Sequence, residues 1–147
     1  RELYILSKLW HPNILPFTGY LVRNGFPAIV SPWIENGNLR SQIQTGRLSS
    51  SDETALSIVR TFTLYLHSQN VVHCDLKSPN VLLSSTNRPI IADFGLSRFV
   101  GNDTSVPFSL TSTGPATVRW SAPELFDGVH HSNATDVWAF GMLLYVR

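Results

Sequence analysis

The chain is poor in cysteine and in charge. Cys74 is the single cysteine among 147 residues, so neither an intrachain disulfide nor a Cys-based zinc cluster can form. Charged residues make up 14% of the sequence, whereas soluble domains carry about 25%. The formal net charge is only +1, which gives no electrostatic reason to expect a nucleic acid or an anionic membrane as partner.

Long apolar runs are also missing. No stretch reaches the ~18 residues of a membrane-spanning helix, and the opening residues RELYILSKLW lack the pattern of a signal peptide. With a single cysteine, this predicts an intracellular, cytoplasmic protein. The sequence starts without Met, ends in the apolar run GMLLYVR, and combines 43% hydrophobic residues with little charge. We therefore expect these residues to be part of a larger domain.

The hydrophobic pattern predicts alternating helices and strands. The best helical pattern runs over residues 48–70, with Asn70 as the residue that stops the helix. Residues 97–115 are rich in Ser, Thr and Gly without periodicity, which is typical of a long loop. Further helices are expected over residues 1–9, 39–45 and 135–146, the last of them buried. Short strands are expected over 14–22 and 26–34, separated by the turn-like RNG at residues 23–25, and VVH, NVLL and IIADF are further short apolar segments.

Three polar phrases stand in order among these apolar segments. They are HCDLKSPN at residues 73–80, ADFGLS at residues 92–97 and RWSAPE at residues 119–124. The set resembles the signature of the protein kinase family, in which a catalytic loop H-R-D-L-x-x-x-N is followed by D-F-G and A-P-E. Further phrases fit the family from RELYILSKLWHPNIL at the start to TDVWAFGMLLY at the end, so the resemblance covers the whole chain.

This resemblance implies an α+β, protein-kinase-like bilobal fold that is incomplete. Residues 1–34 would be a remnant of the small lobe with its helix αC, strands and hinge, and residues 35–147 would be the large lobe through helix αF. The Gly-rich phosphate loop and the strand lysine of the family would precede Arg1, and the last helices would follow Arg147. We therefore expect the isolated 147-residue chain to bind Mg-ATP poorly.

The resemblance also implies a catalytic set that binds ATP and Mg²⁺. Asp75 would orient the substrate hydroxyl and accept its proton, and Lys77 would steady the transferred phosphoryl group. Asn80 would hold a Mg²⁺, and Asp93 of D-F-G would be the main metal ligand, because Mg²⁺ prefers hard oxygen ligands.

An adenine site at the hinge follows from the same resemblance. Ser31 falls at the gatekeeper position, and Leu82 would lie under the adenine ring. Pro32 has no N–H, but the family needs only a carbonyl at this position. The backbone N–H of Ile34 would meet the adenine edge.

A second set of matching positions has structural roles in the family. His73 would pack on Phe94, and with Leu6 and Phe17 these side chains would form the regulatory spine, with Asp136 holding it in place. A catalytic or metal-binding role for His73 is the alternative. Two further positions would form pairs, Glu2 with the missing strand lysine and Glu124 with an arginine beyond the last residue.

Cys74 departs from the family pattern. The usual arginine at this position pairs with a phosphorylated residue of the activation loop, which a cysteine cannot do. We therefore predict activity that does not depend on this phosphate–arginine pair, although the 97–115 segment contains several Ser and Thr hydroxyls.

The substrate class can be read in part. Lys77, two residues after Asp75, is typical of Ser/Thr kinases, and Thr117 matches the Thr that contacts Asp75 and Lys77 in those enzymes. RWSAPE and TDVWAFG are instead typical of tyrosine kinases. The mixture resembles the tyrosine-kinase-like group, which mostly phosphorylates Ser and Thr of protein substrates.

Two alternatives stay open at this point. One is a non-catalytic pseudokinase or interaction scaffold, against which the intact Asp75, Lys77, Asn80 and Asp93 argue. The other is a metal protein that uses a surface cluster, although adjacent histidines rarely converge on one ion without further ligands. That cluster consists of Asp127, His130 and His131.

Overall fold

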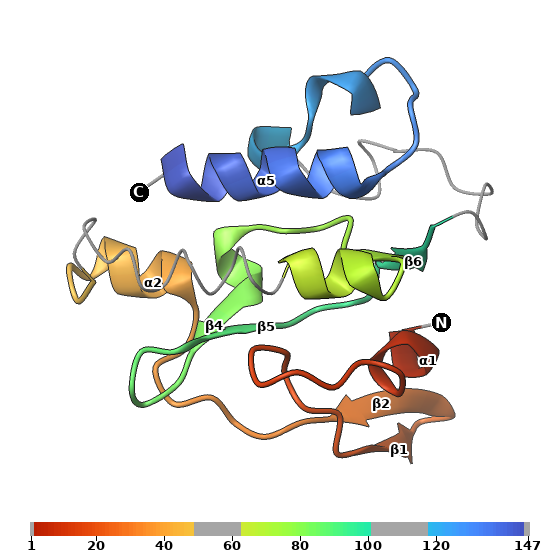
Figure 1. Cartoon of the computed structure of the whole chain (residues 1–147). Coiled ribbons are helices and arrows are strands. Elements are labelled where there is room, and N and C mark those ends of the chain that lie inside the picture. The colour runs from red at the N-terminus through yellow and green to blue at the C-terminus, as the bar shows by residue number, and fades with distance from the viewer. Residues whose placement is uncertain (1, 49–62, 101–117, 146–147) are drawn as a thin grey trace.

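A computed structural model describes residues 2–48, 63–100 and 118–145 and has the mixed α+β architecture that the sequence predicts (Figure 1). Its named helices are α1 (Glu2–Leu6), α2 (Leu39–Gln44) and α5 (Asn133–Tyr145), with 3₁₀ turns at Ser78–Asn80, Val118–Trp120 and Pro123–Leu125. The strands are β1 (Gly19–Arg23), β2 (Phe26–Val30), β3 (Val71–Val72), β4 (Val81–Leu83), β5 (Pro89–Ile91) and β6 (Arg98–Phe99).

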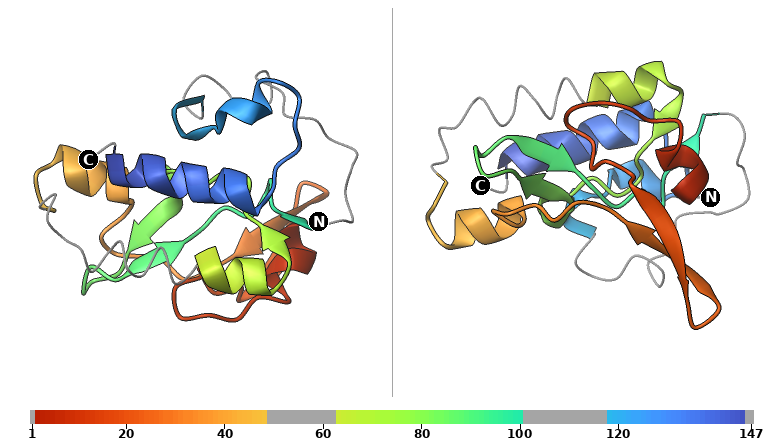
Figure 2. Two further views of the ribbon diagram at one scale, coloured as in Figure 1. Left: turned by 45° about the horizontal axis from the view of Figure 1, so that its top comes forward. Right: turned by 90° about the horizontal axis from the view of Figure 1, so that it is seen from below.

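The described strands pair as three antiparallel two-stranded sheets, β1–β2, β3–β6 and β4–β5. Helix α5 lies on one side of the β4–β5 hairpin, and α1 with the β1–β2 hairpin lies on the other (Figures 1 and 2). The segment between β3 and β4, which contains the phrase HCDLKSPN, therefore runs through the middle of the molecule.

Turn chemistry fixes the β1–β2 hairpin. Asn24 and Gly25 join the strands with φ of 53° and 80°, and Arg23 pairs with Phe26. Positive φ at both central residues defines the primed turn that suits a two-residue hairpin, and Asn-Gly is its preferred sequence. The predicted turn is thus confirmed.

The predicted helix over 48–70 is described only in its last part. Residues 63–68 are helical, and Asn70 follows with a left-handed φ of 56°, as expected of a residue that ends a helix. Residues 49–62 lie outside the described residues. The backbone N–H of Val100 bonds to the carbonyl of Asn70 and ties this helix end to the chain after β6.

One predicted loop begins differently. Arg98 and Phe99, expected as the start of a long loop, form β6 against β3, with Val71 opposite Phe99 and Val72 opposite Arg98. The two adjacent valines favour a strand, but the local sequence does not show which distant segment pairs with it.

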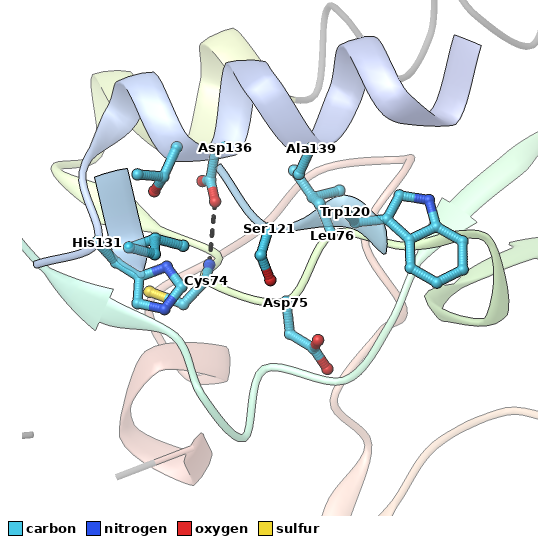
Figure 3. Close-up of a pocket in the computed structure, with 10 residues that line it drawn as sticks. Cys74, Asp75, Leu76, Trp120, Ser121, His131, Asp136 and Ala139 are labelled. Atoms are coloured by element: carbon cyan, nitrogen blue, oxygen red, sulfur yellow. Dashed lines mark hydrogen bonds between the residues drawn. The ribbon is translucent and has the colours of Figure 1, made fainter. Parts of the chain in front are cut away.

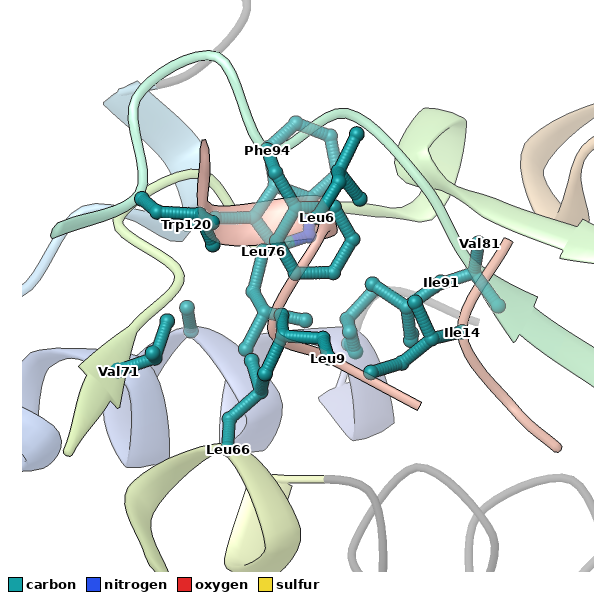
Figure 4. Close-up of a cluster of buried hydrophobic side chains, with 13 residues drawn as sticks. Leu6, Leu9, Ile14, Leu66, Val71, Leu76, Val81, Ile91, Phe94 and Trp120 are labelled. Atoms are coloured by element: carbon teal, nitrogen blue, oxygen red, sulfur yellow. The ribbon is translucent and has the colours of Figure 1, made fainter. Parts of the chain in front are cut away.

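Buried side chains from all three described parts of the chain form one core (Figure 4). Leu6 from α1 and Phe94 lie together in this cluster, and Phe17 packs against it while half-buried. The remaining members are Ile5, Leu9, Ile14, Leu66, Val71, Leu76, Val81, Ile91, Trp120, Ala139 and Leu143.

Helix α5 is buried on one face, whereas its apolar sequence predicts burial all round. Thr135, Asp136, Ala139 and Leu143 face the interior, while Trp138 remains 44% exposed. An apolar sequence shows that a helix can be buried, but the elements that pack against the helix decide which of its faces are buried. Among the described helices, none combines the length and apolar character needed to cross a bilayer.

The segment after α1 is bound to the rest of the molecule at several points. The Tyr65 hydroxyl accepts a hydrogen bond from the Trp10 backbone N–H at 3.0 Å, and its ring lies 4.7 Å from that of His11. The Asn13 side chain donates to the Pro89 carbonyl at 2.7 Å, and Ile91 N–H donates to Asn13 O at 2.7 Å. These contacts fix the end of α1 against β5.

Candidate functional site

Asp136 of α5 holds the segment that begins the phrase HCDLKSPN. Its carboxylate, only 2% exposed, accepts the backbone N–H of His73 at 2.7 Å and that of Cys74 at 3.0 Å (Figure 3). Two charge-assisted hydrogen bonds inside the core are strong and directional. They place the residues that follow, Asp75 first among them, in one orientation.

Two further residues support this segment and were given no role on the sequence alone. His67 Nε2 lies 3.2 Å from Asp136 Oδ2, and Ser97 Oγ donates to the His73 carbonyl at 2.9 Å. His67 faces α5 from the 63–68 helix, so helical periodicity alone could have shown which face it occupies, but not its partner.

The backbone is left-handed at two positions of the site. Cys74 has φ of 68° and Asp93 has φ of 66°. Asp tolerates this region, whereas a cysteine there is uncommon and implies that the surrounding structure fixes it. Cys74 is buried, and its thiol contacts the Val72 carbonyl at 3.5 Å.

Asp75, Lys77 and Asn80 converge. Lys77 Nζ lies 2.8 Å from Asp75 Oδ2, and Asn80 Nδ2 donates to the same oxygen at 3.1 Å and to the Asp75 carbonyl at 2.9 Å. The 3₁₀ turn Ser78–Asn80 folds Asn80 back onto Asp75. The second carboxylate oxygen, Oδ1, is buried and accepts no hydrogen bond from any described residue. It is an acceptor without a donor.

His73 and Phe94 pack together beneath this group. Their ring centroids are 5.0 Å apart, and both side chains are almost fully buried. Burial lowers the pKa of His73, against the opposing effects of Asp136, Asp75 and Asp93. A neutral ring enclosed in this way suits packing better than proton transfer to a substrate.

Asp93 and Asn80 lie on adjoining segments. The backbone N–H of Ala92 donates to the Asn80 carbonyl at 2.9 Å, which brings the start of D-F-G beside the 3₁₀ turn. The Asp93 carboxylate is exposed, and among the described residues it accepts one long hydrogen bond, from Gly95 N–H at 3.3 Å. One carboxylate and one amide oxygen leave most of a metal's coordination to other oxygens, which is the arrangement typical of Mg²⁺ on substrate phosphates.

Glu2 of α1 faces the D-F-G segment. A Cβ placed on Gly95 would lie 3.3 Å from Asp93 Oδ1 and 3.7 Å from Glu2 Oε2, so the two carboxylates border the same glycine. Burial raises the pKa of Glu2, the charge of Asp93 raises it further, and a backbone hydrogen bond from Phe94 lowers it. The Glu2 and Asp93 carboxylates therefore repel each other at this end of the site.

The predicted adenine-site residues come from β4, which contains Leu82, and from the segment that follows β2. Ser31, Ile34 and Leu82 are half-buried and Pro32 is exposed. The chain after the hinge is tied to β4 through Leu83, whose N–H donates to Gly37 O at 2.8 Å and whose carbonyl accepts Asn36 N–H at 3.1 Å. In the described part of the chain no hydrogen bond uses the Ile34 N–H, so it is available to a ligand.

The other predicted positions are dispersed. Glu124 is half-buried within the 3₁₀ turn Pro123–Leu125, and Thr117 lies outside the described residues. Among residues 2–48, 63–100 and 118–145 no three His, Cys, Asp or Glu side chains form a metal-binding group, so Asp127, His130 and His131 do not make one.

A small cavity lies behind the first residues of the phrase HCDLKSPN (Figure 3). It is lined by Cys74, Asp75, His131 and Asp136, with Trp120 at one end. Its volume of about 10 Å³ is at the limit for one water molecule. The cavity cannot take a substrate, but it places His131 close to Cys74.

His131 should make the folding stability depend on pH. Burial, and secondarily the charge of Arg98, lowers the pKa of His131 from 6.5 to about 4. Between these values the unfolded chain binds more protons than the folded one, so stability falls as pH drops from about 6.5 to about 4. His131→Gln should reduce this slope in urea unfolding measured across that range. Its exposed neighbour offers the matched control: His130→Gln should leave the slope unchanged, and equal slopes for both variants would contradict the expectation.

The comparisons with known proteins agree on one family. The family model described as protein tyrosine and serine/threonine kinase matches residues 1–146. A probable serine/threonine-protein kinase of Dictyostelium discoideum is 35% identical over 99% of the chain, which covers 14% of that protein. Ephrin type-B receptor 2 of Gallus gallus is 31% identical over 98% of the chain and 15% of the receptor. The serine/threonine/tyrosine-protein kinase HT1 of Arabidopsis thaliana is 35% identical over 98% of the chain, which spans 37% of HT1.

Proposed function

The chain belongs to the protein kinase family, and we propose that residues 1–147 are part of a catalytic domain that transfers a phosphoryl group from ATP to Ser or Thr hydroxyls of proteins. We assign residues 1–34 to the small lobe and hinge and residues 35–147 to the large lobe. The observation that carries the proposal is the group formed by Asp75, Lys77 and Asn80.

Asp75 can accept the substrate proton. One carboxylate oxygen is occupied by Lys77 and Asn80, while Oδ1 is buried without a donor. A Ser or Thr hydroxyl that donates to Oδ1 would satisfy this oxygen and direct a lone pair of its own oxygen away from the carboxylate, towards a phosphoryl group. In a buried site such positioning, rather than covalent chemistry, supplies most of the rate.

Asp93 and Asn80 would hold Mg²⁺ where ATP binds. The Asn80 side chain donates its amide N–H groups to Asp75, which leaves its amide oxygen for a cation. The exposed Asp93 follows Ala92, whose N–H is bonded to the Asn80 main-chain carbonyl. When bound, Mg²⁺ neutralises charge on the phosphates. It would also relieve the repulsion between Glu2 and Asp93 that raises the Glu2 pKa.

The hinge residues would receive the adenine ring. Ile34 offers a free N–H, Pro32 offers a carbonyl, and Leu82 supplies an apolar surface from the neighbouring strand β4. Ser31 would leave space behind the ring because its side chain is small. These roles rest on the resemblance, and the hydrogen bonds of Asn36 and Gly37 with Leu83 support them, because they join the chain after the proposed hinge to β4.

Lys77 supports Ser and Thr as acceptors. Its ammonium group is held at 2.8 Å by Asp75, so it stands where a short hydroxyl side chain must approach. The relatives have names of both kinds, a probable serine/threonine kinase and an ephrin receptor among them, and do not choose between acceptors.

Three peptides that differ only in a central Ser, Thr or Tyr test this choice. With Mg-ATP, a longer protein that also supplies the phosphate loop and strand lysine should phosphorylate the Ser and Thr peptides at least about tenfold faster than the Tyr peptide. A tenfold ratio corresponds to about 1.4 kcal/mol of difference in the transition state. Faster transfer to Tyr would overturn the Ser/Thr assignment. Binding of Mg-ATP without transfer to any acceptor would favour a scaffold instead.

A further inference from the structure

The dipeptide Asn-Gly occurs at two places, residues 24–25 and 36–37. We propose that Asn24 is a site of spontaneous deamidation, and that the fold protects Asn36 from the same reaction. Glycine favours this chemistry in both because it has no Cβ, so its backbone nitrogen can approach the preceding side chain. The structure separates the two asparagines by their surroundings.

Asn24 stands at an open hairpin tip. Residues 21–27 are all exposed, and a Cβ placed on Gly25 would meet no atom within 4 Å. No described residue is hydrogen-bonded to the Asn24 side chain. Within the two strands only Gly19, Ala28 and Ile29 are half-buried, and all three lie away from the turn. The end of the hairpin can therefore open at low cost, and opening lets Asn24 leave the turn geometry for the geometry of attack.

Asn36 is held at every polar group that the reaction uses. Its Nδ2 donates to the Ser84 carbonyl at 2.8 Å and to Asn87 Oδ1 at 2.8 Å. The attacking nitrogen, Gly37 N, donates to the Ile34 carbonyl at 3.3 Å, and the Gly37 carbonyl accepts Leu83 N–H at 2.8 Å. Reaction at Asn36 therefore requires the β4–β5 turn to release its side chain first.

The reaction needs only the chain and water. The Gly25 nitrogen forms a bond to Asn24 Cγ, the Cγ–Nδ2 bond breaks, and ammonia leaves with the proton from the Gly25 nitrogen. Water then opens the succinimide at either carbonyl and gives Asp or isoaspartate, with no change of oxidation state. Isoaspartate adds one methylene to the backbone between Arg23 and Phe26, which pair across the turn, and a new carboxylate beside Arg23.

Peptide mapping by mass spectrometry tests the proposal on the full 147-residue chain at mildly alkaline pH. Deamidation raises a peptide's mass by about 1 Da. In the folded chain Asn24 should deamidate at least about tenfold faster than Asn36, because the two side-chain hydrogen bonds of Asn36 must break first. In the control, the chain is unfolded in urea, so that only the neighbouring residues influence each deamidation rate. Under these conditions the rates at Asn24 and Asn36 should approach each other.

Asn87→Gly provides the second arm, because glycine accommodates the left-handed φ of 60° at this position without strain. It removes one acceptor from Asn36 and should speed reaction at Asn36 severalfold in the folded chain, while the rate at Asn24 stays constant. The same ratio of rates in the folded and unfolded chain would overturn the proposal, and so would a folded chain in which Asn36 reacts first. The outcome does not depend on kinase activity.

Discussion

Asp75→Asn should lower the rate of phosphoryl transfer by about 10²–10⁴-fold, the usual contribution of a general base. The Asn side chain keeps the size of Asp but loses the negative charge that holds Lys77 at 2.8 Å and the basic oxygen that receives the proton. The measurement is transfer of labelled phosphate to a Ser-containing protein substrate at saturating Mg-ATP. KM for ATP should change little, because the assigned metal ligands are Asn80 and Asp93.

Asp127→Ala is the control for this experiment. It removes an exposed carboxylate from the turn after Pro123–Leu125 and should leave transfer unchanged. Urea unfolding of both variants separates a catalytic loss from a folding defect, since Asp75 is itself buried. Activity of Asp75→Asn within a few-fold of the unchanged protein would contradict the role assigned to Asp75.

Asp136→Ala should reduce the free energy of unfolding by about 3–5 kcal/mol, a large part of the 5–15 kcal/mol typical of a domain. The substitution leaves the buried backbone N–H groups of His73 and Cys74 without an acceptor. Each orphaned donor costs about 1–3 kcal/mol. The unfolding midpoint in urea measures the loss, and faster hydrogen exchange at these two amides locates it.

Asp136→Asn gives the graded comparison. The amide retains one oxygen acceptor, so it should lose less stability than Asp136→Ala, and its amide nitrogen would face one of the two N–H donors. The exposed Asp127→Ala should fall within about 0.5 kcal/mol of the unchanged chain. Similar unfolding midpoints for Asp136→Ala and Asp127→Ala would show that Asp136 does not hold the segment.

Local sequence patterns predicted the elements whose causes are local. The Asn24–Gly25 turn and the helix stop at Asn70 follow from residues that tolerate positive φ, and both are confirmed. The order of the three polar phrases predicted the kinase family, which the comparisons confirm. A family signature predicts more of the structure than hydrophobic periodicity does, because the family's fold also defines how distant segments are arranged.

Contacts between distant segments were the features that the sequence did not show. β6 pairs with β3, and His67 reaches Asp136 from another helix. The spacing of residues in the sequence does not indicate either pair, because contacts across a core depend on how whole helices and strands pack. The one-sided burial of α5 has the same origin, since its neighbours and not its composition decide which face is covered.

The bonds between the segment after α1 and β5 have a mechanical consequence. Asn13 is joined to Pro89 and Ile91, and Asp93 follows Ile91 by two residues. The segment after α1 and the strand that leads to Asp93 are thus hydrogen-bonded side by side. A displacement of this segment would therefore be transmitted to β5, two residues before Asp93, without any contact at the site itself.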